Sequence, residues 1–346
     1  MTEHLILLAP SANRVYAADA PRLCEAELRA LAAGFGLPEP DVARTEVAGV
    51  DYLTLRTSGD LTDAAVRVVS QLSAVHALFR REGDLLAPVP LERPRASYPG
   101  DLVTIQKYQG KTNEQWTRLL LNVTAAATRR PEKLLDGSLQ VFDPMCGRGT
   151  TLNIALSLGL DSVGVDLDSK DFQAYSAFLK TWMRQHRLKH AADESSLRTS
   201  GRNRGKQLQV EVAASKEAHR AGDTQHVTYL LTDTTDLDGL IRPRSVDAIV
   251  TDTPYGVQHG SHGDDRLARS PLQLLDRALP GWLKVLRTGG AIGLSYNRHV
   301  AHRDDLVALL STHGLAPADG AADVFRHRVD ASIDRDLIVA RKLHAK

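Results

Sequence analysis

The N-terminal region alternates short apolar runs with amphipathic segments. This pattern predicts strands over Leu5–Ala9 and Val50–Thr57 and helices over Pro21–Ala33 and Leu61–Phe79. A proline-rich stretch, LLAPVPLERPRASYPG, follows, and proline interrupts both strands and helices. We therefore expect a small α+β domain over residues 1–95 that positions the substrate, with a linker at its end.

Further along the chain, the apolar runs are those of a buried parallel sheet. Runs at 139–142, 161–165, 227–232, 246–251 and 291–295 alternate with amphipathic helical segments. Strands that alternate with helices in this way predict an α/β fold with a doubly wound, mostly parallel sheet. Two later strand-like runs, VFRHRV and ASIDRDLIVARK, predict a closing hairpin.

The first strand of this sheet leads into a glycine turn. The segment Leu139–Thr151, LQVFDPMCGRGTT, passes from an apolar run through Asp143 to Gly147 and Gly149, and a helix opens at Thr150. A strand, a tight turn and a helix in this order direct backbone N–H groups at a bound small molecule. A dinucleotide is one candidate, although the turn lacks the third glycine of the usual dinucleotide motif.

Four aspartates stand where strands of this sheet end, namely Asp143, Asp166, Asp233 and Asp252. Because ligands of such sheets bind at the carboxyl ends of the strands, we expect the four side chains to converge on one crevice. S-adenosylmethionine presents an ammonium group, a ribose diol and an adenine amino group, which three carboxylates can accept in turn. We assign Asp143 to the ammonium, Asp166 to the ribose and Asp233 to the adenine. Asp168 is an alternative to Asp166.

The fourth acid belongs to the stretch VTDTPYGVQHG, which resembles the D-P-P-Y signature of amino-group methyltransferases acting on nucleic-acid bases. Two acceptors for the hydrogens of an exocyclic amine make its nitrogen a better nucleophile. We expect these to be the Asp252 carboxylate and the Thr253 backbone carbonyl. Pro254 would stiffen the turn, and Tyr255 would stack on the extruded base. Thr253 replaces the first proline of the signature, which keeps the carbonyl but loosens the turn. The alternative is a turn with an incidental aspartate and tyrosine.

Together, DPMCGRGTT and TDTPYG resemble the Rossmann-like methyltransferase domain of the RNA guanine-N2 methyltransferases, including the tRNA guanine-10 and large-subunit rRNA enzymes. The resemblance covers about residues 98–343 and implies a class I methyltransferase domain over 96–346 with a mostly parallel seven-stranded sheet. It also implies S-adenosylmethionine as the cofactor. The stretch YQGKTN resembles the segment that wraps this cofactor, so Thr112 is a cofactor-binding candidate. The remaining candidates, besides the three aspartates, are Cys146, Gly147, Gly149, Thr150 and Leu167. Cys146 is a small residue of the turn rather than a nucleophile.

A polar insertion at about residues 187–225 separates two of the predicted strands. Its basic residues are Arg187, Lys189, Arg198, Arg202, Arg204 and Lys206. One interpretation is a solvated, mobile loop. The other is an arm that contacts phosphates and partly replaces the RNA-binding domain of the tRNA enzymes, for which the N-terminal domain is too short.

Composition restricts the function only a little. Of the 346 residues, 42% are hydrophobic and 25% charged, as in soluble globular enzymes, and the formal net charge of +1 excludes a globally basic surface for nucleic acid. The two cysteines suit a reducing cytosol, and no apolar run reaches bilayer length. The His259/His262 and His299/His302 pairs have neither a neighbouring cysteine nor a helical frame, which speaks against a metal site. We therefore expect a cytoplasmic protein with no metal and no membrane partner.

The leading hypothesis is an S-adenosylmethionine-dependent N-methyltransferase that acts on an exocyclic base amine in RNA. Guanine N2 in tRNA is the favoured target, and rRNA is a second one. Two alternatives stay open: a DNA methyltransferase for adenine N6 or cytosine N4, and a non-catalytic RNA-binding protein that retains the fold. The sequence does not indicate an oligomeric state.

Overall fold

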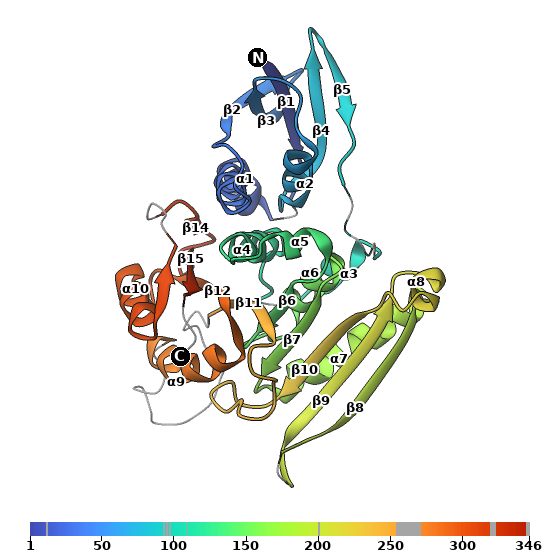
Figure 1. Ribbon diagram of the computed structural model, residues 1–346, viewed down its shortest axis with the longest axis vertical. Coiled ribbons are helices and arrows are strands. Elements are labelled where there is room, and N and C mark those ends of the chain that lie inside the picture. The colour runs from blue at the N-terminus through green and yellow to red at the C-terminus, as the bar shows by residue number, and fades with distance from the viewer. Residues whose placement is uncertain are drawn as a thin grey trace.

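The computed structural model describes residues 1–11, 13–92, 94, 96, 98–108, 110–199, 201–253, 271–318 and 323–343. Its described strands form two sheets, one of five strands near the N-terminus and one of ten strands (Figure 1). Helix α4 (Glu114–Ala126) lies between the N-terminal unit and the larger sheet (Figure 1).

The first sheet has the strand order β2-β3-β1-β4-β5, and every neighbouring pair is antiparallel. Its strands are β1 (Thr2–Leu8), β2 (Asp41–Val47), β3 (Val50–Thr57), β4 (Val75–Glu82) and β5 (Leu85–Val89). Helices α1 (Arg14–Gly34) and α2 (Asp63–Gln71) pack on the side that faces α4 (Figure 1). This arrangement confirms a small α+β unit, including both strands predicted here.

The predicted single helix over Leu61–Phe79 is wrong in its second half. Helix α2 ends at Gln71, and from Val75 the chain runs as β4, where Phe79 pairs with Leu5 of the central strand β1. The apolar residues of this segment fit both the helical period of about 3.6 residues and the strand period of 2. Hydrogen bonding to β1 stabilises the strand. Strand β5 lies inside the predicted linker. The proline-rich stretch can form this strand because β5 is at the edge of the sheet, where the missing N–H of Pro88 is tolerated.

The second sheet has the order β13-β15-β12-β11-β6-β7-β10-β9-β8, with β14 paired to β15. The five strands from β12 to β10 are parallel, and β15 and β13 add antiparallel partners at one side. The strands are β6 (Gln140–Asp143), β7 (Asp161–Asp166), β10 (Gln225–Leu231), β11 (Val246–Asp252), β12 (Leu286–Asn297), β13 (Leu315–Pro317), β14 (His327–Arg328) and β15 (Asp334–Lys342). The predicted Rossmann-like α/β fold is confirmed, and β14 with β15 forms the predicted closing hairpin.

Helices connect these strands and cover the sheet. They are α3 (Asp101–Thr104), α5 (Glu132–Asp136), α6 (Thr150–Ser157), α7 (Ser169–Gln185), α9 (Pro271–Val285) and α10 (Arg303–Thr312). Within the described part of the chain, no helix is both long and apolar enough to span a bilayer.

The insertion at about 187–225 is a β-hairpin rather than the loop that its polarity suggested. Strands β8 (Lys189–Thr199) and β9 (Arg202–Ala213) pair with each other, β9 pairs antiparallel with β10, and helix α8 (Lys216–Arg220) follows. The reason is an alternation within β9, where Leu208, Val210 and Val212 are buried against helix α7. The described hairpin therefore extends the sheet beyond the seven strands that the family resemblance implied.

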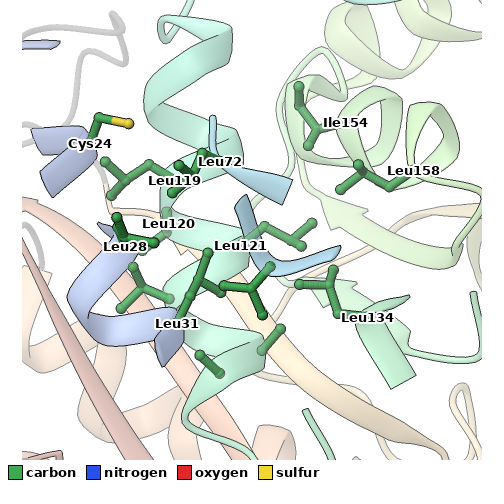
Figure 2. Packing of buried hydrophobic residues seen from close by; sticks show 14 of the residues in the cluster. Cys24, Leu28, Leu31, Leu72, Leu119, Leu120, Leu121, Leu134, Ile154 and Leu158 are labelled. Carbon is green, nitrogen blue, oxygen red and sulfur yellow. The ribbon is translucent and has the colours of Figure 1, made fainter. Parts of the chain in front are cut away.

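One hydrophobic cluster joins the two units. It contains Leu28 and Leu31 of α1, Leu119 and Leu121 of α4, and Ile154 of α6 (Figure 2). At the same contact the buried carboxylate of Glu27 accepts hydrogen bonds from Ser73 N–H at 3.0 Å and Asn122 Nδ2 at 2.7 Å. Because this core is continuous, the N-terminal unit is fixed on α4, and the division at residue 95 stays a prediction from sequence.

Candidate active site

The carboxyl ends of four adjacent parallel strands carry the four predicted aspartates. Asp252 ends β11, Asp143 ends β6, Asp166 ends β7, and Asp233 follows two residues after β10. The strand order β11-β6-β7-β10 therefore sets these residues side by side along one edge of the sheet. This edge is the expected place for a ligand of a doubly wound sheet.

The glycine turn between β6 and α6 is held by backbone contacts to its neighbours. Gly147 and Gly149 have φ values of 48° and 77°, in the left-handed region that favours glycine. A Cβ at Gly149 would approach the ring of Tyr175 to 2.2 Å. The N–H of Cys146 donates to Val165 O at 2.9 Å, and the hydroxyl of Tyr229 donates to Gly147 O at 2.8 Å. These contacts to β7 and β10 fix the backbone of the turn.

Cys146 lies inside this turn as a packing residue. Its side chain is buried, and burial raises the pKa of its thiol well above the ordinary value. A Cβ on Gly164 of β7 would lie 2.7 Å from Cys146 Sγ, so the strand needs glycine there to admit the sulfur. This position agrees with a small turn residue and not with a thiolate nucleophile.

Asp143 is buried beneath the turn, with 3% of its surface exposed. Burial raises its pKa to about 6, against the opposing effects of a hydrogen bond from Thr151 and of the Met145 N–H, 3.1 Å from Oδ1. A nearby cation would favour the ionised form, so the site is suited to an ammonium group.

Asp166 connects the turn with the end of β7. Its Oδ2 accepts from Gly147 N–H at 2.8 Å, and its Oδ1 accepts from Asp168 N–H at 2.9 Å. Burial raises its pKa. Asp168, the alternative candidate for binding the ribose, instead caps helix α7 by accepting a hydrogen bond from Lys170 N–H at 2.7 Å. Leu167, between them, is 70% exposed at the site edge.

Asp233 is exposed beyond the end of β10. Its Oδ1 accepts from the N–H of Thr235 at 2.8 Å and from the hydroxyl of the same residue at 2.7 Å. These two bonds orient the carboxylate within a turn at the edge that Asp166 also occupies.

Asp252, half-buried at the end of β11, receives a hydrogen bond from a segment far away in sequence. The hydroxyl of Thr112 donates to Asp252 Oδ2 at 2.7 Å. Tyr108, four residues before Thr112, places its hydroxyl 3.1 Å from Thr150 Oγ1 and stacks under the Arg148 guanidinium. The segment around YQGKTN therefore spans from the glycine turn to the fourth acid, and Thr112 lies against that acid.

Thr253 is held more firmly than its sequence suggested. Its N–H donates to Ser295 O at 2.8 Å, and its hydroxyl donates to the same oxygen at 3.0 Å. A proline could make neither bond, so two hydrogen bonds to β12 take over the restraint that the ring would supply. Pro254 and Tyr255, the other two predicted target-site residues, lie outside the described residues.

Sequence reasoning missed three residues that build this edge. Tyr108 lies in the quoted YQGKTN stretch, but its contact with Thr150, 42 residues further along the chain, has no local signal in the sequence. Ser295 and Tyr229 act through a backbone carbonyl and a phenol hydroxyl, and neither has a local pattern that would reveal it.

Part of the larger sheet domain matches a known family model. Residues 133–289 match the model of the UPF0020 family, described as an RMKL-like methyltransferase domain. The match includes the glycine turn and the strand ends of all four aspartates. It confirms the predicted methyltransferase class and S-adenosylmethionine as its cofactor, and it agrees with the predicted likeness to RNA guanine-N2 methyltransferase domains.

Solved structures show a more distant similarity. An rRNA methylase from Streptococcus thermophilus is 12% identical, with 68% of this chain and 100% of that chain covered and a TM-score of 0.35. The 1,6-didemethyltoxoflavin-N1-methyltransferase from Burkholderia thailandensis is 16% identical, covering 65% and 79%, with a TM-score of 0.36. Magnesium protoporphyrin IX methyltransferase from Synechocystis is 14% identical, covering 67% and 86%, with a TM-score of 0.38. Similarity at this level adds nothing to the family match.

Proposed function

We propose that this protein transfers a methyl group from S-adenosylmethionine to an exocyclic base amine in RNA, with guanine N2 in tRNA as the first candidate. The observation that carries the proposal is the position of Asp252. It ends the strand next to Asp143, receives the Thr112 hydroxyl, and precedes a residue bonded twice to β12. An acid that is fixed in this way beside a cofactor edge is equipped to accept a proton from the target amine.

The side chains along the edge fit S-adenosylmethionine, a compound that carries its methyl group on a positively charged sulfur. Buried Asp143 would hold the ammonium, and Gly147, where an added Cβ would have no neighbour closer than 3.9 Å, leaves its backbone open to the methionine end. Asp166 would accept the ribose hydroxyls, because each of its oxygens has a further lone pair beyond its backbone bond. Exposed Leu167 offers an apolar surface to the adenine, and Asp233 would accept from the adenine amino group.

The target residues would act on the base nitrogen. Asp252 and the Thr253 carbonyl would accept the two amine hydrogens, which concentrates the nitrogen lone pair towards the methyl group. As the new N–C bond forms, the bond from carbon to sulfur breaks, and one amine proton leaves towards Asp252. Tyr255 would stack on the base.

RNA is favoured over DNA by the joint resemblance of DPMCGRGTT and TDTPYG to the guanine-N2 enzymes. In the part of the chain that the structure describes, every strand belongs to the two sheets above, and no strands form a separate module for reading a DNA sequence. The cytoplasm, where tRNA and rRNA are modified, is the proposed location.

Nucleoside mass spectrometry tests the proposal directly. Digests of tRNA and rRNA from cells with and without the gene should differ in N2-methylguanosine, and the purified protein should restore it with S-adenosylmethionine. A difference confined to DNA digests would establish the DNA alternative. Calorimetry that detects no binding of S-adenosylmethionine would instead favour the non-catalytic RNA-binding protein.

A further inference from the structure

We infer that the tip of the β8–β9 hairpin is a docking surface for the sugar–phosphate backbone of the RNA substrate. The inference deepens the proposed function and depends on RNA being the substrate. It starts from charge: residues 195–210 contain four Lys and Arg and no Asp or Glu. The acids of the hairpin, Asp193, Glu194 and Glu211, all lie towards its base.

The tip lies at the edge that carries the active-site acids. Leu231, the last residue of β10, pairs with Lys206 of β9, and the pair Gln225–Val212 lies at the other end of the same ladder. The described residues of the tip, 198–199 and 201–205, therefore run past the carboxyl end of β10, where Asp233 follows. Figure 1 shows the hairpin continuing beyond the end of β10 at the lower side of the molecule.

The tip is anchored to the domain, which fixes its direction. Leu197 is buried in the core cluster that includes Leu237 of the loop after β10. Gly205 approaches the chain so closely that a Cβ would lie 1.9 Å from Leu231 O. Arg204 donates to Asp236 O at 3.0 Å. The hairpin is therefore a fixed projection beside the site.

Two arginines of this tip stay available for a partner. Arg198 and Arg202 are exposed, and neither forms an ion pair with another described residue, whereas Arg204 is engaged with Asp236. Guanidinium groups bind phosphates through two parallel hydrogen bonds. The N-terminal unit offers a weaker surface for RNA, since residues 1–95 hold thirteen Asp and Glu against ten Arg and no Lys.

The structure supplies a matched control on the same insertion. Lys216 and Arg220 of α8 are also exposed, but they follow β9 at the opposite end of the hairpin, away from the acids (Figure 1). The pair Arg198→Gln/Arg202→Gln and the pair Lys216→Gln/Arg220→Gln remove the same charge from the full chain. Only the first pair removes it at the site edge.

The probe is a bulk tRNA mixture, titrated at several KCl concentrations. We expect Arg198→Gln/Arg202→Gln to weaken binding about tenfold and to lower the slope of log affinity against log salt by about 1.5, since each phosphate contact contributes about 0.7 to 0.9. The KM for RNA should rise, kcat and the Kd for S-adenosylmethionine should stay constant, and the α8 pair should match the wild type. Circular dichroism and the Tm verify that both variants fold.

The outcomes separate this inference from the proposed function. If both double variants bind tRNA equally weakly, the effect comes from net charge alone and the inference is overturned. The inference is also overturned if the wild type methylates RNA and Arg198→Gln/Arg202→Gln binds it with wild-type affinity. A wild type that binds tRNA through these arginines but transfers no methyl group would overturn the function and leave the surface standing. Stronger binding of duplex DNA, lost in the same pair, would overturn RNA as the partner.

Discussion

The glycine turn with Asp143 and Asp166, which is the proposed cofactor half of the site edge, and Asp252 with Thr253, the proposed target half, are built in different ways. At the glycine turn, main-chain N–H groups bond to the next strand along the chain, β7: Gly147 N–H donates to Asp166 and Cys146 N–H donates to Val165 O. At the target strand, Asp252 and Thr253 are held by Thr112 and Ser295, from two distant segments. The first half depends mainly on the main-chain geometry of one strand, turn and helix and of the next strand, whereas the second depends on side chains and carbonyls from distant segments.

Substitutions in the two halves should therefore affect different quantities, cofactor binding in one and catalysis in the other. Changes at the turn should affect cofactor affinity and stability together, because the same backbone serves both. Changes around Asp252 should affect turnover while cofactor affinity stays constant. Four predictions test the contrast, in order of decreasing effect.

Asp252→Ala should have the largest effect. Loss of the acid that is proposed to accept the amine proton should lower kcat about 10²- to 10⁴-fold, the range for general base catalysis, and the Kd for S-adenosylmethionine should change less than about twofold. Single-turnover methyl transfer and calorimetry measure the two quantities. Activity within tenfold of the wild type would remove Asp252 from the mechanism and leave the cofactor half untouched.

Gly149→Ala should damage the other half. Its Cβ would meet the Tyr175 ring at 2.2 Å, in a backbone with φ of 77°. We expect a loss of about 2–4 kcal/mol in the free energy of unfolding, from overpacking and backbone strain, together with weaker cofactor binding. Gly36→Ala is the control, because Gly36 has a similar φ of 66° and no neighbour within 4 Å. Equal losses in both variants would show that the Tyr175 contact is unimportant.

The same contrast explains what the sequence could predict. Asp143, Gly147 and Gly149 were found because a strand, a turn and a helix start are written within a few consecutive residues. The partnership of Thr112 with Asp252 was not found, since no local pattern connects segments so far apart, and Thr112 was assigned to the cofactor instead.

The β8–β9 hairpin was not predicted for a different reason. The alternation of Leu208, Val210 and Val212 with polar residues was present in the sequence, but the charges around it dominated the interpretation. Burial of those three side chains against α7 outweighs the solvation of their neighbours, which all point the other way or lie at the tip.

Asp143 provides a prediction about pH. Its pKa is about 6 in the folded protein and about 3.8 in an unfolded chain, so the folded state binds the proton more tightly. This carboxyl therefore destabilises the free protein above pH 6, and that cost disappears as the pH falls from 6 to 4. Asp143→Asn should raise stability at pH 8 by about 1–3 kcal/mol and leave it nearly unchanged at pH 4, while it weakens cofactor binding at pH 8.

Thermal unfolding of both proteins at the two pH values measures the first effect, and calorimetry the second. Met145 N–H keeps an acceptor in the Asn variant, so the turn itself should persist. A variant that is less stable than the wild type at pH 8 would mean that the carboxylate is solvated rather than buried. A variant that binds the cofactor normally would reassign the ammonium to another group.

Substitution of Thr112 should have the smallest effect on activity, and it tests most directly whether this residue belongs to the target half or the cofactor half. Thr112→Val keeps the shape of the side chain and removes the hydroxyl that donates to Asp252 Oδ2, which should lower kcat about tenfold, the size expected for one hydrogen bond to a charged group. Thr112→Ser retains the donor and should restore most of the activity. The KM for RNA and the Kd for S-adenosylmethionine should not change, because the contact orients the acid and touches neither substrate. If Thr112→Val weakens cofactor binding while kcat is preserved, Thr112 belongs to the cofactor half after all. The boundary between the two halves would then lie between Thr112 and Asp252.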